Sequence, residues 1–102
     1  MKSCPVVLAG ALLAVSGWAS AQAMDFLQVR GMAAACAGCH GTHGLARSGP
    51  WSLAGAGRDE LLQKMLAFKT GARPATVMHQ ITRGYSNEEL GALAAYFSIQ
   101  KK

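Results

Sequence analysis

Two cysteines and a histidine stand together in the run Cys36-Ala-Gly-Cys39-His40, which contains three of the chain's six cysteines and histidines. Two thiols separated by two residues fit on one helical turn, from which both can reach the two vinyl groups along one edge of a porphyrin. The histidine that follows can then present its imidazole to an iron ion under the ring plane. In an exported chain, this C-x-x-C-H spacing predicts covalent attachment of a c-type haem.

The same side chains allow three other uses. Cys36, Cys39, His40 and His43 are possible zinc ligands. The two cysteines could act as a redox pair of the thioredoxin type, but the βαβ pattern that such a pair requires does not surround them. They could also form a disulfide, which an oxidising compartment favours. His43 follows the Gly41-Thr42 turn, and we expect it to face solvent.

Residues 1–23 have the layout of a secretory signal peptide. Lys2 is the single early charge, residues 6–15 form an apolar run, and Ala21-Gln-Ala23 matches an A-x-A cleavage site. The apolar run is shorter than the roughly 20 residues of a membrane span. We therefore predict a signal peptide at 1–23 and one domain at 24–102, located in the periplasm without stable membrane insertion after cleavage. An uncleaved anchor is the alternative.

Composition limits the size and kind of fold. The 102 residues carry 10 Lys and Arg against 5 Asp and Glu, a formal net charge of +5, and 51% are hydrophobic while 15% are charged. This length supports one domain and excludes a doubly wound sheet or a (β/α) barrel. The composition is that of a folded chain, and a domain this small often requires a disulfide, a metal or a bound group to complete its core. We predict no nucleic-acid partner.

Three segments have the apolar spacing of helices and none has the alternation of a strand, so the predicted fold class is all-α. The first helix is expected over Asp25–Ala35 and the second over Arg58–Thr70. The third follows the capping box Ser86-Asn-Glu-Glu89. Residues 37–57, with six glycines, and 72–85 are predicted to be irregular. A large flat apolar group between the helices would complete their core.

The chain resembles the class I c-type cytochromes over nearly all of residues 25–102. The resemblance lies in three runs: Cys36-Ala-Gly-Cys-His-Gly-Thr-His-Gly44, Pro50-Trp-Ser-Leu-Ala-Gly55 and Met78-His-Gln-Ile-Thr-Arg-Gly-Tyr-Ser-Asn-Glu-Glu-Leu90. It implies the class I cytochrome c fold, with three main helices wrapped around one haem. It also implies that this haem c is bound covalently through Cys36 and Cys39.

The resemblance implies roles for three further residues. His40 is the expected proximal iron ligand, and the carbonyl of Pro50 is expected to accept a hydrogen bond from its other ring nitrogen, which orients the imidazole. Met78 stands where the family has its sixth ligand, with His79 as the rival ligand and an open or labile site as the remaining alternative. A His/Met pair raises the reduction potential of the iron and closes both axial positions, which suits electron transfer.

Two functions compete. The run Ile81-Thr-Arg-Gly-Tyr-Ser-Asn-Glu-Glu-Leu90 is similar to the haem subunit of flavocytochrome c sulfide dehydrogenase. This similarity implies a redox partner, an exported flavoprotein that oxidises sulfide and passes electrons to this haem. The chain has no flavin motif, so we expect no enzyme activity from it alone. The alternative is a free soluble periplasmic shuttle between respiratory partners, whose positive charge favours acidic docking surfaces. A haem-based ligand sensor, with an easily displaced Met78, is a third class.

Overall fold

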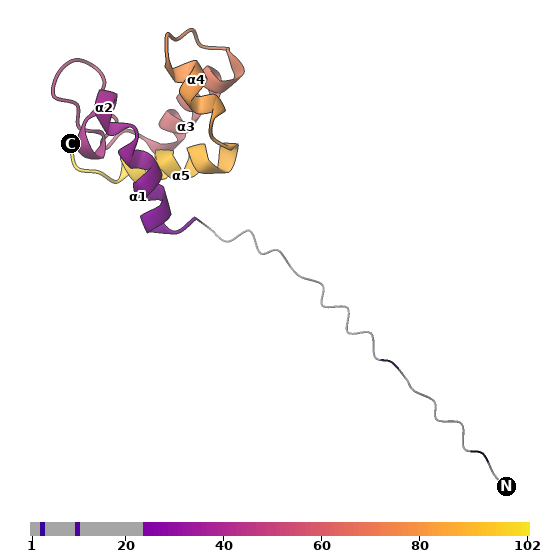
Figure 1. Cartoon of the computed structure of the whole chain (residues 1–102). Helices are drawn as coiled ribbons and strands as arrows, with labels where there is room; N and C mark the ends of the chain where they lie inside the picture. The colour runs from indigo at the N-terminus through magenta and orange to yellow at the C-terminus, as the bar shows by residue number, and fades with distance from the viewer. Residues whose placement is uncertain (1–2, 4–9, 11–23) are drawn as a thin grey trace.

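The computed structural model describes Ser3, Gly10 and residues 24–102, which contain five α-helices and one 3-10 helix (Figure 1). In chain order these are α1 (Phe26–Ala34), α2 (Ala37–His40), η1 (Thr42–Gly44), α3 (Arg58–Thr70), α4 (Met78–Arg83) and α5 (Asn87–Ser98). The described residues contain no strand, which confirms the all-α prediction for them. None of their helices is long and apolar enough to cross a membrane. The expected signal peptide at 1–23 lies outside the described residues.

The longest helices begin and end where local sequence signals predict. Ser86 caps α5, because its hydroxyl accepts a hydrogen bond from the Glu89 amide (3.1 Å) and the Glu89 carboxylate accepts one from the Ser86 amide (2.8 Å). Helix α3 ends at Gly71, which has a left-handed φ of 84°. Within α3, a hydrogen bond from Lys64 to the Glu60 carboxylate, together with the lysine's charge, lowers the pKa of Glu60.

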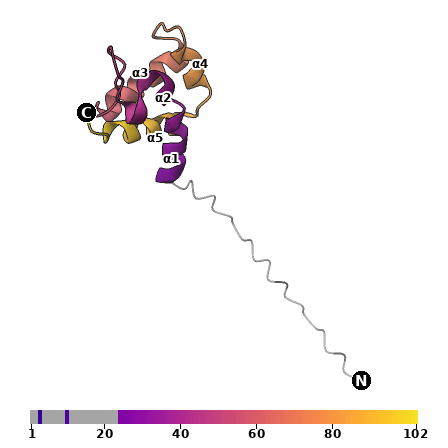
Figure 2. The same ribbon diagram turned by 60° about the vertical axis from the view of Figure 1, so that its left-hand side comes forward.

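Helix α5 is the centre of the hydrophobic core. Its apolar side chains at i, i+3, i+4 and i+7 are each at most 3% exposed: Leu90, Leu93, Ala94 and Phe97. Val29 and Ala33 of α1 and Leu61 of α3 are buried in the same cluster. Figures 1 and 2 show α1 crossing α5, with the ring of Phe26 packed 6.0 Å, centroid to centroid, from that of Tyr96. The three longest helices thus enclose one core.

Two segments expected to be irregular contain short helices. Helix α2, within 37–57, is the helical turn that the C-x-x-C spacing predicts. The prediction of an irregular chain is wrong at η1 in the same segment and at α4 within 72–85. The Thr82 side chain is 1% exposed, and its hydroxyl donates to the carbonyl of Met78 at 2.7 Å. A six-residue helix is too short to produce a clear periodic pattern, and its stability comes from packing, in this case against α3.

Helix α5 also sets the separation between the two segments that carry the candidate ligands. Near its C-terminal end, the Gly55 amide donates to the carbonyl of Phe97 at 3.0 Å, which fixes the loop after η1. Helix α4 precedes its N-terminal end by a short connection. Figure 1 shows α2 and α4 on the same side of α5, above its two ends. The core therefore sets the relative positions of His40 and Met78.

Candidate haem site

A single helical turn holds Cys36, Cys39 and His40. Cys36 is the N-cap of α2, and its carbonyl accepts hydrogen bonds from the amides of Cys39 (3.3 Å) and His40 (2.9 Å). Both thiols are free, the first half-buried and the second exposed, so the disulfide alternative is not what the structure shows. Burial, and secondarily the nearby Cys39, raises the pKa of the Cys36 thiol. The turn presents two thiols and one imidazole together, as their spacing predicts.

A backbone carbonyl holds the ring of His40. Its Nδ1–H donates to the carbonyl of Trp51 at 2.6 Å, and the two rings lie 6.1 Å apart between centroids. The expected acceptor was the carbonyl of Pro50, so that prediction is wrong by one residue. Pro50 and Trp51 lie in the same turn, and the path of this turn brings the carbonyl of Trp51, rather than that of Pro50, to the His40 ring. Either carbonyl would orient the imidazole of His40 in the same way. With the proton on Nδ1, the lone pair of Nε2 is free to bind a metal.

The loop after His40 depends on left-handed backbone conformations. A Cβ atom at Gly41, where φ is 81°, would collide with the carbonyl of Leu45. At Gly44, where φ is 78°, a Cβ atom would lie 2.7 Å from the Phe97 ring. These two positions require glycine, since any side chain there would be strained and would displace its neighbours.

His43 lies in the same loop and has a left-handed φ of 53°. Its side chain is exposed, as predicted, but its Nδ1 also shares a hydrogen bond with the Tyr96 hydroxyl at 2.8 Å. Within residues 24–102, no group of three or more His, Cys, Asp or Glu side chains is placed to hold a metal ion. The zinc alternative therefore gains no support from the position of His43.

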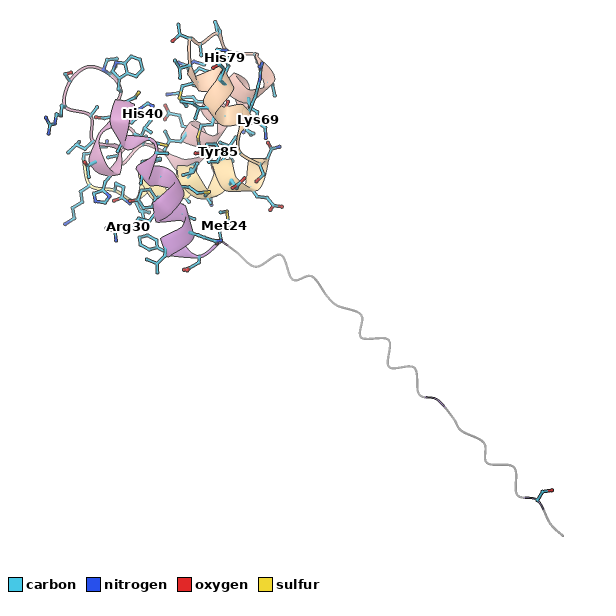
Figure 3. The ribbon with its side chains drawn as sticks, viewed as in Figure 1. Met24, Arg30, His40, Lys69, His79 and Tyr85 are labelled. Atoms are coloured by element: carbon cyan, nitrogen blue, oxygen red, sulfur yellow. The ribbon has the colours of Figure 1, made fainter. Side chains whose placement is uncertain are left out.

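Helix α4 carries both candidates for the second axial ligand. Met78 and His79 are half-buried at the start of this helix, which packs against α3. Lys69 of α3 donates to the carbonyl of Tyr85 at 2.6 Å and to Oδ1 of Asn87 at 3.0 Å. Figure 3 shows Lys69 and Tyr85 beside α4, and His79 and His40 on the separate segments of α4 and α2. The lysine thus ties the chain after α4 to α3.

Large apolar side chains are exposed on both ligand-bearing segments. Each is at least 40% exposed: Leu45 and Trp51 after His40, and Val77 and Ile81 beside Met78. Burying such a side chain is favourable by about 1.5–3 kcal/mol, so these surfaces favour a large apolar partner. A haem has wide apolar faces, two vinyl groups for the free thiols and an iron for the Nε2 atom of His40. The residues present therefore fit this group.

Comparison with known proteins agrees with this assignment. No protein-family model matches the chain. The chain is 40% identical over 68 residues to the cytochrome subunit of sulfide dehydrogenase of Chlorobaculum tepidum, an alignment that covers 66% of this chain and 62% of that protein. It is 34% identical over 99 residues to cytochrome c4 of Azotobacter vinelandii, with 87% of this chain and 47% of that protein covered. Cytochrome c4 of Pseudomonas aeruginosa is 36% identical over 90 residues, with 87% and 44% covered.

The fold, the Cys36–His40 turn and these relatives together define a class. The chain is similar to c-type cytochromes, and its helical architecture is that of the class I cytochrome c fold, which confirms the predicted fold. Among them it resembles the cytochrome subunit of a sulfide dehydrogenase, although it spans only about half to three fifths of the length of the relatives above. Cytochromes of this class carry covalently attached haem c, and Cys36 and Cys39 have the spacing for that attachment.

Three contacts around the site had no usable signal in the sequence. The acceptor for His40 lies at Trp51, because the path of a turn decides which carbonyl reaches the ring. The bond between His43 and Tyr96 joins residues 53 positions apart. Lys69 indicated only a basic residue near a helix C-terminus, whereas the structure shows it linking two helices. Each contact depends on tertiary packing.

Proposed function

We propose that this chain is an exported carrier of single electrons, with haem c attached at Cys36 and Cys39 and held by His40 and Met78. The haem supplies an iron that accepts and releases one electron. The observation that carries the proposal is the oriented imidazole of His40, whose Nδ1 hydrogen bond at 2.6 Å reserves Nε2 for the iron on the same turn as both thiols. Similarity to c-type cytochromes supports electron transfer as the role of the chain.

The residues of the chain determine how such a site would behave. The hydrogen bond that His40 donates to the Trp51 carbonyl makes its imidazole a more basic ligand. The thioether of Met78 would favour the reduced iron and so raise the reduction potential. Two axial ligands supplied by the chain leave no open position for oxygen or peroxide. This arrangement favours electron transfer over catalysis by the chain alone.

Replacing the methionine tests the ligand set. We expect Met78→Ala to retain the pyridine haemochrome of a c-type haem, to lose the weak long-wavelength absorption of a methionine-ligated ferric haem and to lower the reduction potential. Met65→Leu is the control, because Met65 packs against the core from α3 and a Met-to-Leu change there conserves volume. An unchanged spectrum and potential in Met78→Ala would show that another group is the ligand.

We further propose that a sulfide-oxidising flavoprotein is the electron donor. The similarity to a protein named the cytochrome subunit of sulfide dehydrogenase supports this partner. The net charge of +5, which becomes +4 when Lys2 leaves with the signal peptide, favours an acidic docking surface on it. The second candidate is a free periplasmic shuttle, and the similarity to two proteins named cytochrome c4 is its support.

Co-expression with an exported flavoprotein separates the two candidates. If the chain is a subunit, the two proteins elute together and sulfide reduces the haem rapidly in the complex but not in the isolated cytochrome. Elution of the cytochrome as a monomer, with no reduction by sulfide and flavoprotein together, would favour the shuttle.

Mass spectrometry of the same preparation tests export, because cleavage after Ala23 leaves a chain that begins at Met24.

A further inference from the structure

Lys69 connects the two ends of the segment that carries Met78. This lysine is in the last turn of α3, and its ammonium donates to the carbonyl of Tyr85 at 2.6 Å and to Oδ1 of Asn87 at 3.0 Å. The two acceptors lie 16 and 18 positions further along the chain, just after α4 and at the start of α5. Figure 3 shows Lys69 beside Tyr85. The segment 70–84 therefore begins and ends next to the same side chain.

Hydrogen bonds continue from this contact to Met78. The amide of Tyr85 donates to the carbonyl of Thr82 at 3.3 Å. The hydroxyl of Thr82, a residue that is 1% exposed, donates to the carbonyl of Met78 at 2.7 Å. A continuous series of hydrogen bonds thus joins the ammonium of Lys69 to the backbone of Met78. Because a buried polar group left without its partner is costly, a movement of Met78 that breaks this series is unfavourable.

The other lysine of α3 makes a contact of a different kind. The ammonium of Lys64 donates to the carboxylate of Glu60 on the same helix at 2.7 Å, and the two side chains are 47% and 61% exposed. Such an exposed pair within one helix contributes little to tertiary structure. Lys69 is half-buried and bonds to a different part of the chain, in a last turn where the helix dipole favours a positive charge. The two lysines therefore provide a matched comparison within one helix.

An axial ligand is displaced when the segment that carries it opens locally, and contacts that close the segment make this opening less favourable. We propose that Lys69 is a positioning residue, which holds Met78 at the haem iron by closing the segment 70–84. This inference rests on the proposed function, with Met78 as the second axial ligand. Removal of the ammonium should make Met78 easier to displace by an added ligand. Haem attachment at Cys36 and Cys39 should be unchanged.

Titration of the ferric holoprotein with imidazole measures this displacement. Imidazole that replaces the methionine removes the weak long-wavelength absorption, so its apparent affinity reports how firmly Met78 is held. We expect Lys69→Met, which keeps the apolar stem, to raise the imidazole affinity about tenfold, the change expected for one lost hydrogen bond. Lys69→Arg keeps a cationic donor and should recover part of this effect. Lys64→Met is the matched control, and its imidazole affinity should equal that of the unaltered protein.

Thr82→Val tests the other end of the hydrogen-bond series, and it keeps the inference testable if Lys69→Met does not fold. This change removes the hydroxyl that donates to the carbonyl of Met78, and it should also raise the imidazole affinity. In the double variant, the combined increase should be smaller than the product of the two single increases, because both changes act on one series. Independent effects would contradict a connection from Lys69 to Met78 through Thr82.

The remaining results separate failure of this inference from failure of the proposed function. If Lys69→Met lowers the free energy of unfolding but binds imidazole like Lys64→Met, the role of Lys69 is purely structural and the inference is wrong. Methionine-ligated absorption in both variants would then still support the proposed ligand set. If the unaltered protein lacks that absorption and Met78→Ala leaves its spectrum unchanged, the inference and the proposed ligand set are both wrong.

Discussion

Helix α5 buries its apolar side chains, whereas the two ligand-bearing segments, α2 with the loop that follows it and α4, leave large apolar side chains exposed. On α5, Leu90 and Leu93 are 1% and 2% exposed and pack against α1 and α3. On the ligand-bearing segments, Trp51 and Ile81 are 54% and 40% exposed. In the first region, apolar side chains are buried against other parts of the chain. In the second, a bound haem would bury the exposed apolar side chains, so the two regions depend on different sources of stability.

The strongest test of this comparison removes the haem attachment. We expect the double substitution Cys36→Ser and Cys39→Ser to abolish the c-type haemochrome and to lower the free energy of unfolding sharply, because the variant loses the apolar contacts that only the folded chain makes with its attached haem. Hydrogen exchange measured on this variant should lose protection first in α2 and α4, and last in α5. Equal loss in all helices would contradict the division into two regions, and the single Cys39→Ser variant, with one thioether left, should lie between.

The same division explains what could be predicted from the sequence. The spacing of Leu90, Leu93 and Phe97 and the capping box at Ser86 are local signals, and the structure follows them. The C-x-x-C-H run also predicted its helical turn, because that turn consists of consecutive residues and does not depend on distant contacts. Burial of His79 and the extent of α4 could not be predicted, because a short helix has too little periodicity and its orientation is decided by contacts with α3.

A core substitution gives a smaller effect that acts on the first region. We expect Leu93→Ala to destabilise the holoprotein by about 2–5 kcal/mol, because it removes buried methyl groups and leaves a cavity beside α1 and α3. Chemical denaturation measures this change. Leu27→Ala is the matched control, since Leu27 is 69% exposed and its loss should change stability by less than about 0.5 kcal/mol. Similar losses in both variants would contradict the central position of α5, and the reduction potential should change in neither.

The smallest effect concerns the connection between the two regions. Ser86 caps α5 directly after the segment that follows α4, and both of its capping-box bonds are present. We expect Ser86→Ala to lower the free energy of unfolding by about 1 kcal/mol, the usual cost of losing such a cap. Ser48→Ala, at an exposed position in the loop after η1, serves as the control. If the cap supports only α5, the reduction potential is unchanged. A lowered potential with equal haem content would instead show that the start of α5 also fixes α4, and would place Ser86 functionally with the ligand-bearing segments rather than with the core.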